Sequence, residues 1–420
     1  MASKGNAGFY GENCRGGGSR YVWTRPFSRA DLAGICVKFS ERKVTNKLRI
    51  NELSALVRGM TGHPRIIFDR LFDVWQGAGE LILPEGIKDW VRERFGSSVG
   101  VEKQSIVKIV NRVTLEGALF NKLRSRRPLA CGEERRLEDI IAEHREGCAF
   151  CQADDSTPLD VFGRLSIPGA VTAANVAKYD RWHSLIIPDE HNPLCFDDER
   201  VANNFALAGV WFNRVLEQAG QARDKESLYP FLMWNCLWPA GSSVVHGHLQ
   251  VTVTGGMHYP QVERLRRAAL GYRKRYGANY FDDLCAAHRS VGLAVESGRA
   301  RVLISLTPIK EKETWIVMPE EDEGHLESLP RLGRLVGRVL ACLRQTGTTS
   351  FNAAVYLPPP VPTSEDWSGF PLLARVVDRG DALGRTADFG GMELFAASVV
   401  AADPFSLLSD MHDQLCVSHL

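Results

Sequence analysis

Three polar side chains, His246, His248 and Gln250, alternate with small or apolar residues in the segment FLMWNCLWPAGSSVVHGHLQVTVTGG, residues 231 to 256. In a β-strand successive side chains point to opposite faces, so residues spaced by two share one face. The turn-forming residues Pro239 to Ser243 precede this row. The pattern predicts two strands joined by a glycine–serine loop, with three polar groups in line on one face. The alternative is a solvated polar strand.

Such a row can carry out chemistry on phosphate esters. A neutral imidazole attacks phosphorus, and a covalent nucleotidyl-histidine divides one displacement into two easier ones. We predict that His248 is this nucleophile, with its second ring nitrogen held by an acceptor. The loop at Gly241, the hydroxyl of Ser243 and the amide of Asn235 can bind phosphate oxygens. Gln250 has no transferable proton near neutral pH, which favours transfer to a phosphate acceptor over hydrolysis.

Cys148 and Cys151 form a C-x-x-C motif in EGCAFCQAD, whose turn can direct both sulfurs at one ion. A tetrahedral zinc ion would need two further ligands. A buried thiol pair or a redox motif is the alternative. The chain has 10 cysteines, and the remainder are scattered, as in a protein from a reducing compartment.

The elements around these residues occur twice. The run WHSLIIPDEH (residues 182 to 191) and the run TWIVMPEEDEGH (residues 314 to 325) are each an apolar strand that ends in proline, acidic residues and histidine. An amphipathic helix pattern and then an asparagine-containing strand follow each of them. The order predicts a duplicated α+β unit, with a chance match of apolar patterns as the alternative.

Composition narrows the class of protein. The chain has 420 residues, with 51 basic and 50 acidic side chains and a formal net charge of +1, so no chain-wide field attracts nucleic acid or anionic lipid. No run reaches the 18 or more apolar residues of a membrane span, and the first residues lack the apolar core of a signal peptide. We therefore expect a cytoplasmic protein without nucleic-acid or membrane partners.

The pattern N-x5-G-x-S-x2-H-x-H-x-Q, from Asn235 to Gln250, resembles the galactose-1-phosphate uridylyltransferase branch of the histidine-triad superfamily, which also holds dinucleoside polyphosphate phosphorylases and GDP-galactose phosphorylases. The resemblance implies an α+β fold of two histidine-triad halves, each with an antiparallel sheet and flanking helices. We expect a first half at 105–260, a second half at 261–420, and an N-terminal extension of unknown role at 1–104.

The resemblance also implies ligands for a zinc ion. In bacterial members of the family, a histidine after the first-half strand and the first histidine of the H-x-H pair complete the site. His191 and His246 match these positions and would complete the ligand set with Cys148 and Cys151. His183 is the rival of His191, and we favour His191 because it follows the Pro-Asp-Glu turn.

Further substrate-binding residues follow from the resemblance alone. Arg124 and Arg127, in NKLRSRRP, match a basic segment that reaches the nucleotide phosphates, although such runs are often solvated surface. Asn175 matches a residue that touches the base or ribose, and Glu393 one that contacts sugar hydroxyls. Members of the family often form dimers, so a homodimer is expected.

These features together predict a nucleotidyltransferase that moves a nucleoside monophosphate from a nucleotide sugar, or a similar compound, to a phosphate acceptor. A sugar phosphate acceptor would make it a uridylyltransferase-type enzyme, which Cys148, Cys151 and Glu393 favour. Inorganic phosphate would make it a phosphorylase of nucleotide sugars or dinucleoside polyphosphates, which Leu249 favours. Two rival classes are a hydrolase, which Gln250 disfavours, and a non-catalytic nucleotide- or RNA-binding protein.

Overall fold

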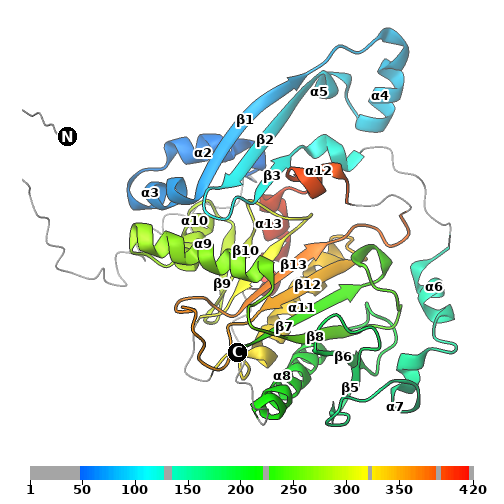
Figure 1. Cartoon of the computed structure of the whole chain (residues 1–420). Helices are drawn as coiled ribbons and strands as arrows, with labels where there is room; N and C mark the ends of the chain where they lie inside the picture. Colours follow the sequence, from blue (N-terminus) through cyan, green and yellow to red (C-terminus); the bar gives the residue numbers. More distant parts are fainter. Residues whose placement is uncertain (1–47, 127–134, 221–226, 320–323, 385–388, 416–420) are drawn as a thin grey trace, which may run out of the picture. The chain divides into compact units, whose positions relative to one another are not determined.

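The computed structural model describes residues 48–126, 135–220, 227–319, 324–384 and 389–415 (Figure 1). All of them belong to one structural unit. Within these residues no helix combines the length and the apolar character that crossing a membrane requires.

A ten-stranded sheet with only antiparallel neighbours forms the centre of this unit. Its strand order is β4-β5-β6-β8-β7-β12-β13-β11-β10-β9, so the sequence of neighbours in one half repeats in reverse in the other. The strands are β4 (Ser166–Ile167), β5 (Ala170–Ala174), β6 (Trp182–Pro188), β7 (Leu228–Cys236), β8 (Leu249–Gly255), β9 (Ala294–Ser297), β10 (Ala300–Ile304), β11 (Thr314–Val317), β12 (Phe351–Tyr356) and β13 (Leu373–Asp378).

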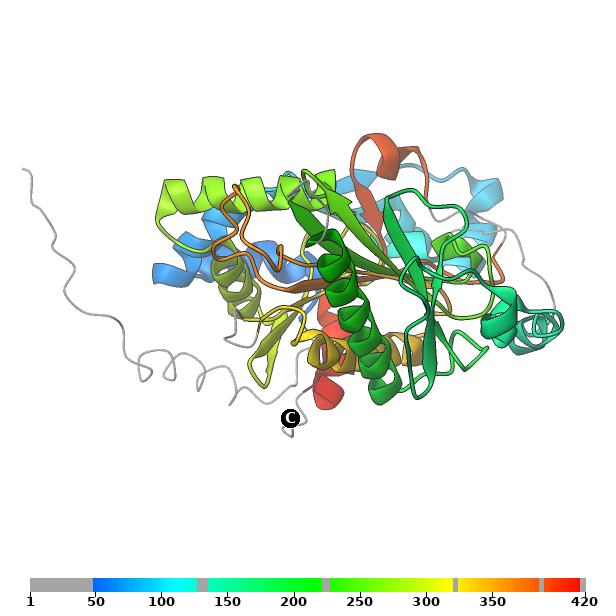
Figure 2. The same cartoon turned by 60° about the horizontal axis from the view of Figure 1, so that its bottom comes forward.

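The two halves meet where β7 pairs with β12, and Asn235 lies opposite Asn352 at this junction. Each half places one long helix on the same face of the sheet, α8 (Asp198–Gly220) in the first and α11 (Leu329–Gln345) in the second (Figure 2). Strands, helix and asparagine-containing strand therefore recur in the predicted order. The duplicated α+β fold expected from the sequence is confirmed.

The two helices approach closely because α11 has glycine where it meets α8. A Cβ atom at Gly333 would lie 2.8 Å from the Cβ of Phe205, and one at Gly337 would lie 2.7 Å from the Cα of Asp198. Real carbon atoms do not approach to these distances without displacement. The small residues therefore set the spacing of the helix layer that supports the sheet.

A second, four-stranded sheet has the order β1-β2-β3-β14, with β1 (Phe72–Glu80), β2 (Lys103–Asn111), β3 (Gly117–Phe120) and β14 (Ser398–Val400). The boundary expected at residue 104 falls inside β2, which pairs with β1 along its whole length. The Asn111 amide donates to the hydroxyl of Tyr280 at 2.8 Å, and Arg375 donates to Glu116 at 3.0 Å. These contacts join the N-terminal strands to the second half.

The remaining helices surround the two sheets. The α-helices are α2 (Leu53–Gly59), α3 (Gly62–Leu71), α4 (Lys88–Phe95), α5 (Ser98–Glu102), α6 (Leu137–Glu143), α7 (Ala153–Ser156), α9 (Pro260–Tyr276), α10 (Tyr280–Ser290), α12 (Gly391–Phe395) and α13 (Pro404–Leu415). Short 3-10 turns lie at Ile50–Glu52 (η1), Glu85–Ile87 (η2), Lys122–Arg126 (η3), Ala149–Gln152 (η4) and Trp238–Ala240 (η5).

The histidine segment differs from the prediction in one respect. Strand β8 begins at Leu249, so His246 and His248 lie in the loop segment that leads into it rather than within a strand. Leu249 and Val251 are fully buried, whereas Gln250 is only partly covered. The alternation of the strand therefore still separates a core face from a polar face.

Candidate active site and metal centre

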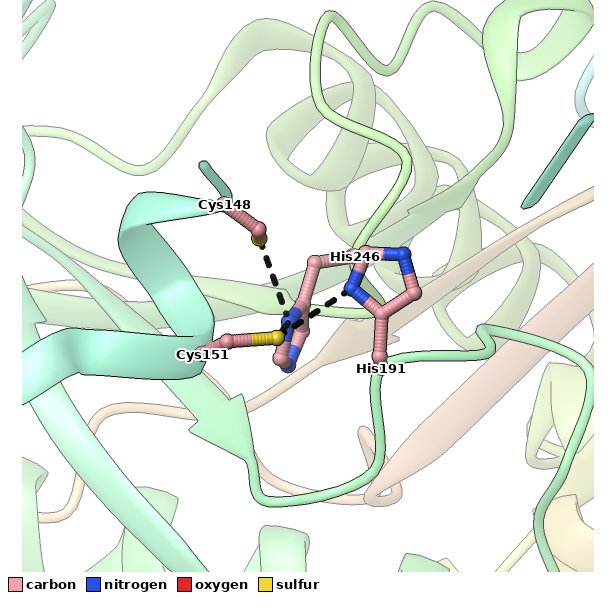
Figure 3. Close-up of side chains that lie close together, drawn as sticks. All are labelled: Cys148, Cys151, His191 and His246. Atoms are coloured by element: carbon pink, nitrogen blue, oxygen red, sulfur yellow. Dashed lines mark hydrogen bonds between the residues drawn. The ribbon is translucent and has the colours of Figure 1, made fainter. Parts of the chain in front are cut away.

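The side chains of Cys148, Cys151, His191 and His246 converge, and their ligand atoms all lie within 4.8 Å of one another (Figure 3). Cys148 precedes η4, and Cys151 lies in it. His191 follows the end of β6, and His246 precedes β8. All four predicted metal-binding residues are thus brought together from segments far apart in the sequence.

The geometry of this group fits a metal ion. The Sγ of Cys151 lies 3.4 Å from the Nδ1 of His191 and 3.5 Å from that of His246, and the Sγ of Cys148 lies 3.6 Å from the Nδ1 of His246. Ligands about 2.2 Å from a tetrahedral ion lie about 3.6 Å from one another. Two thiols and two imidazoles are also a ligand set typical of structural zinc sites.

Backbone carbonyls fix which nitrogen of each histidine faces this centre. The Nε2 of His191 donates to the Ile141 carbonyl at 3.0 Å, and the Nε2 of His246 donates to the Pro188 carbonyl at 2.8 Å. Since a neutral imidazole has one N–H, each Nδ1 keeps its lone pair for a ligand. Burial and the neighbouring Cys148 raise the pKa of the Cys151 thiol, so two adjacent thiolates are disfavoured without a cation.

His248 is 6% exposed and is oriented by its own chain. Its Nδ1 lies 2.9 Å from the carbonyl oxygen of His246, which can only accept, so Nδ1 carries the proton and Nε2 the lone pair. Burial lowers the pKa of His248, which keeps the ring neutral near pH 7. The edge of its ring meets Phe150, at 5.2 Å between centroids, and Phe150 also contacts His246 at 5.8 Å.

The amide of Gln250 has a defined orientation. Its Oε1 accepts a hydrogen bond from the hydroxyl of Tyr179 at 2.9 Å and lies 3.1 Å from the Nε2 of His183. Since the oxygen faces these partners, the amide NH2 group points away from them and is available as a donor. His183, the rival metal ligand, is fully buried in this second cluster, with Asn175 Nδ2 at 3.0 Å from its Nε2.

The amide of Asn235 is oriented in the same way from the second half of the molecule. Asn352 Nδ2 donates to Asn235 Oδ1 at 2.7 Å and to the Ala240 carbonyl at 2.9 Å. Arg379 in turn donates to Asn352 Oδ1. Trp234 and Leu249 form the last pair of the antiparallel β7–β8 ladder. Asn235 follows Trp234 and His248 precedes Leu249, so Asn235 and His248 occupy the next paired position beyond the ladder.

The loop between β7 and β8 contains a tight turn at Gly241. Gly241 has a φ of +88°, which glycine adopts without strain, and Ser243 is exposed. Ser242, by contrast, donates its hydroxyl to the Val244 carbonyl at 2.7 Å. Of the two serines, Ser243 is therefore the one we expect to contact a ligand.

For three expected substrate-binding residues, the described residues show no contact with the histidine segment. Arg124 is exposed in η3, a turn that packs against α4, and among the described residues no hydrogen bond or ion pair joins it to the histidine segment. Arg127 lies outside the described residues. Glu393 lies in α12 rather than on a strand, and its Oε2 accepts from the backbone N–H of Gly390 at 3.0 Å, so it caps its own helix.

Sequence reasoning did not foresee which residues orient the two amides, namely Tyr179, His183, Asn352 and Arg379, and it considered His183 only as an alternative metal ligand. The repeat offered a signal for Asn352, because an asparagine occurs in the corresponding strand of each half. No local pattern distinguishes the other three residues. They become visible only when β6, β8 and β13 assemble into one sheet.

Some solved structures have an architecture similar to that of this chain. No protein-family model and no curated protein matches the sequence. Among solved structures, an ADP-glucose phosphorylase from Arabidopsis thaliana with bound ADP-glucose has a TM-score of 0.53 at 16% identity, over 72% of this chain and 96% of that one. A GalT-like protein from Arabidopsis thaliana has a TM-score of 0.50 at 16% identity, over 64% and 93%. The chain therefore has the fold that these two proteins share.

Proposed function

We propose that this protein is a nucleotidyltransferase that acts by double displacement through a covalent nucleotidyl-His248. The observation that carries the proposal is the state of His248. Its Nδ1–H is held by the His246 carbonyl, and its Nε2 keeps the lone pair. Two amides with their oxygens already occupied stand beside it, those of Asn235 and Gln250.

In the first step Nε2 forms a bond to the α-phosphorus of a nucleoside diphosphate derivative. The bond from this phosphorus to the bridging oxygen breaks, and the distal phosphate ester leaves with the electron pair. Nδ1 keeps its proton, so the ring becomes cationic, and the His246 carbonyl stabilises this charge. In the second step a phosphate oxygen of the acceptor attacks the same phosphorus, and Nε2 recovers its electron pair.

The two amides and Ser243 suit the charge that develops during these steps. N–H donors directed at the transferring phosphoryl group stabilise its oxygens more in the transition state than in the ground state. Gln250 cannot supply a proton to a leaving group, nor can it remove one from water. The intermediate is therefore expected to persist until a phosphate acceptor arrives, which favours transfer over hydrolysis.

Cys148, Cys151, His191 and His246 would hold a zinc ion, which supplies a structural cross-link between the C-x-x-C segment and the histidine segment. Phe150, between the two cysteines, packs against both His246 and His248. The position of the C-x-x-C turn therefore affects the ring that reacts. His246 and Phe150 act as positioning residues for His248.

The substrate class is a nucleotide sugar or a similar diphosphate, as in the ADP-glucose complex of a protein with this fold. A sugar phosphate and inorganic phosphate are the two candidate acceptors. Inorganic phosphate gains support from Glu393, which caps its own helix instead of presenting its carboxylate to a sugar. Asn175, next to His183 and Gln250, and the exposed Arg124 remain candidates for nucleotide contacts.

Incubation with α-labelled nucleotide sugars and dinucleoside polyphosphates tests the proposal. Wild type should acquire one acid-labile label per chain, and His248→Ala should acquire none. His63→Ala, which changes an exposed histidine of α3, is the matched control and should label normally. Binding of nucleotide without any label in the wild type would instead indicate a non-catalytic nucleotide-binding protein.

A further inference from the structure

A cavity of about 230 Å³ lies behind the histidine segment, on the helix face of the ten-stranded sheet. Trp234 and Gly247 line it, together with residues of α8 and of the segment after β6. Side chains alternate along β7, so Trp234 and Asn235 point to opposite faces of the sheet. Asn235 belongs to the proposed reaction centre, and the cavity therefore lies on the other side of the sheet from it.

The segment that carries the two histidines forms one wall of this cavity. Gly247 lies between His246 and His248, and its N–H donates to the His191 carbonyl at 3.4 Å. A Cβ atom at Gly247 would lie 3.1 Å from the Cα of Pro193, so the segment after β6 packs directly on it. A ligand in the cavity would contact the backbone between the proposed metal ligand and the proposed nucleophile.

A buried amide on the cavity wall has no protein partner. Asn204 of α8 lines the cavity and is 5% exposed, and within the described residues no hydrogen bond or ion pair involves its side chain. The indole N–H of Trp234 is also buried without an acceptor in this part of the chain. Buried polar groups of proteins are nearly always hydrogen-bonded, so two unpaired groups beside one cavity indicate a bound molecule.

The size of the cavity limits what this molecule can be. One water molecule takes up about 30 Å³ of the liquid, so about 230 Å³ is too large a space for a single bridging water. Pockets for drug-sized ligands measure about 300–1,000 Å³. The expected ligand is therefore a small molecule, comparable in size to a monosaccharide or a nucleobase.

The charge of the lining disfavours an anion. The charged residues on the cavity wall are Asp189, Glu190 and Arg200. The Arg200 guanidinium lies 4.0 Å from Glu190 and 4.0 Å from Asp197, so carboxylates already balance its charge. Asp189 forms no ion pair within the described residues, which leaves the lining negative. A nucleotide or a sugar phosphate would be repelled here.

Hydrogen-bonding capacity favours a sugar over a planar base. The Phe196 ring contacts Trp234 at 5.4 Å between centroids, and the guanidinium of Arg344 lies over it at 5.6 Å. Trp234 is 2% exposed, so it offers almost no ring surface for stacking. The carboxylate of Asp189 only accepts hydrogen bonds, and the amide of Asn204 both donates and accepts them. Sugar hydroxyls can donate and accept, so they match both groups.

We propose that this cavity binds an uncharged monosaccharide. One hydroxyl donates to the carboxylate of Asp189, and neighbouring hydroxyls accept from and donate to the amide of Asn204. The inference goes beyond the proposed function, because binding on the helix face requires no covalent chemistry at His248.

Cys195 provides a local readout, because it is exposed and lines the same cavity. In the full-length protein, carbamidomethylation of Cys195 by iodoacetamide is followed on its own peptide by mass spectrometry. D-glucose or D-galactose should slow this reaction in a saturable manner. Glucose 1-phosphate and adenosine, added at the same concentrations, should not slow it.

Variants locate the bound sugar. Asn204→Leu removes the amide and should raise the sugar concentration for half-maximal protection by about 10-fold. Asp189→Ala should raise it by about 10- to 100-fold, and because this side chain is exposed its loss leaves the fold intact. Asn213→Leu is the matched control, since it changes an exposed asparagine of the same helix that does not line the cavity. It should be protected as well as the wild type.

Three results would overturn the inference. Absence of protection by either hexose up to its solubility limit would remove the site. Adenosine or glucose 1-phosphate that protects as well as the hexoses would contradict the class of ligand. Equal protection in wild type, Asn204→Leu and Asp189→Ala would place the sugar elsewhere, whereas a loss in either variant that is absent from Asn213→Leu supports the site.

Gln250→Ala separates this site from the proposed reaction centre, because Gln250 pairs with Met233 and lies on the other face of the sheet from Trp234. Undiminished protection of Cys195 in Gln250→Ala supports the inference, whether or not the wild type becomes labelled by nucleotides. Loss of protection in Gln250→Ala would show that the hexose binds at the reaction centre. That result would overturn the inference and leave the proposed function intact.

Discussion

Replacement of Tyr179 by phenylalanine tests whether the orientation of the Gln250 amide matters for the reaction. The Tyr179 hydroxyl donates to Gln250 Oε1 at 2.9 Å, and this contact helps to direct the NH2 group away from Tyr179 and His183. Loss of one neutral hydrogen bond costs about 0.5–1.5 kcal/mol. This energy corresponds to a change of about 2- to 12-fold in the population of the productive orientation.

The expected result for Tyr179→Phe is a decrease of this size in kcat, with little change in KM. The donor acts on charge that grows in the transition state, so ground-state binding changes less. Tyr179 is 57% exposed, so water can replace part of the contact and the effect should lie toward the lower end. Single-turnover labelling by an α-labelled nucleotide sugar measures the rate of the first step directly.

Tyr259→Phe is the matched control, because the hydroxyl of Tyr259 donates to Asp180 at 2.7 Å and lies 3.1 Å from the hydroxyl of Thr252, and does not contact Gln250. The role assigned to Tyr179 is refuted if Tyr179→Phe labels at the wild-type rate while Gln250→Ala is strongly slowed. It is equally refuted if both tyrosine variants lose the same activity, since the effect would then not depend on the amide.

Three further predictions concern metal content and stability. Purified protein should carry about one zinc per chain, and Cys148→Ser should lose it; elemental analysis that finds no zinc in the wild type would remove the site. Burial lowers the pKa of His258 to about 4. Between pH 6.5 and about pH 4 the unfolded chain therefore binds up to one more proton than the folded chain, and the free energy of unfolding falls by about 1.4 kcal/mol per pH unit. Urea unfolding at pH 5 and 6.5 should show this slope reduced in His258→Asn, and an unchanged slope contradicts the assignment. Gly333→Ala should lower the free energy of unfolding by about 1–3 kcal/mol in urea at neutral pH, because the new Cβ would collide with α8. Gly271→Ala in α9, with nothing within 4 Å of the new Cβ, should raise the free energy of unfolding slightly.

The two halves of the duplicated fold differ in their side chains, so the chain has a single proposed reaction centre. A repeated sheet brings two equivalent strand ends to the junction at Asn235 and Asn352. The first half carries His248, the proposed nucleophile, and at the equivalent position the second half has Val377. The second half still contributes Asn352 and Arg379, which act on the first half across the junction. The function of this fold therefore depends on side chains rather than on the shared architecture.

Several features followed from the sequence because they depend on local spacing. The separation of His246, His248 and Gln250 by two residues predicted one active segment on a strand, and of the three Gln250 lies within β8 while the two histidines directly precede it. The C-x-x-C turn brings Cys148 and Cys151 together without the rest of the fold. The helices α8 and α11 and the asparagine strands β7 and β12 likewise follow from periodicity and order.

Other features were decided only when distant segments met. His183 lies within strand β6 and His191 follows it. The pairing of β6 with β8 brings His183 to Gln250, and the turn after β6 brings His191 to the cysteines. Arg124 belongs to a basic run that predicted a phosphate contact. The guanidinium that contacts Asn352 is instead that of Arg379, which lies in no basic run. Sequence periodicity determines which side of a strand a residue occupies. It contains no information about which strand comes to lie alongside, and that pairing sets every contact between the two halves.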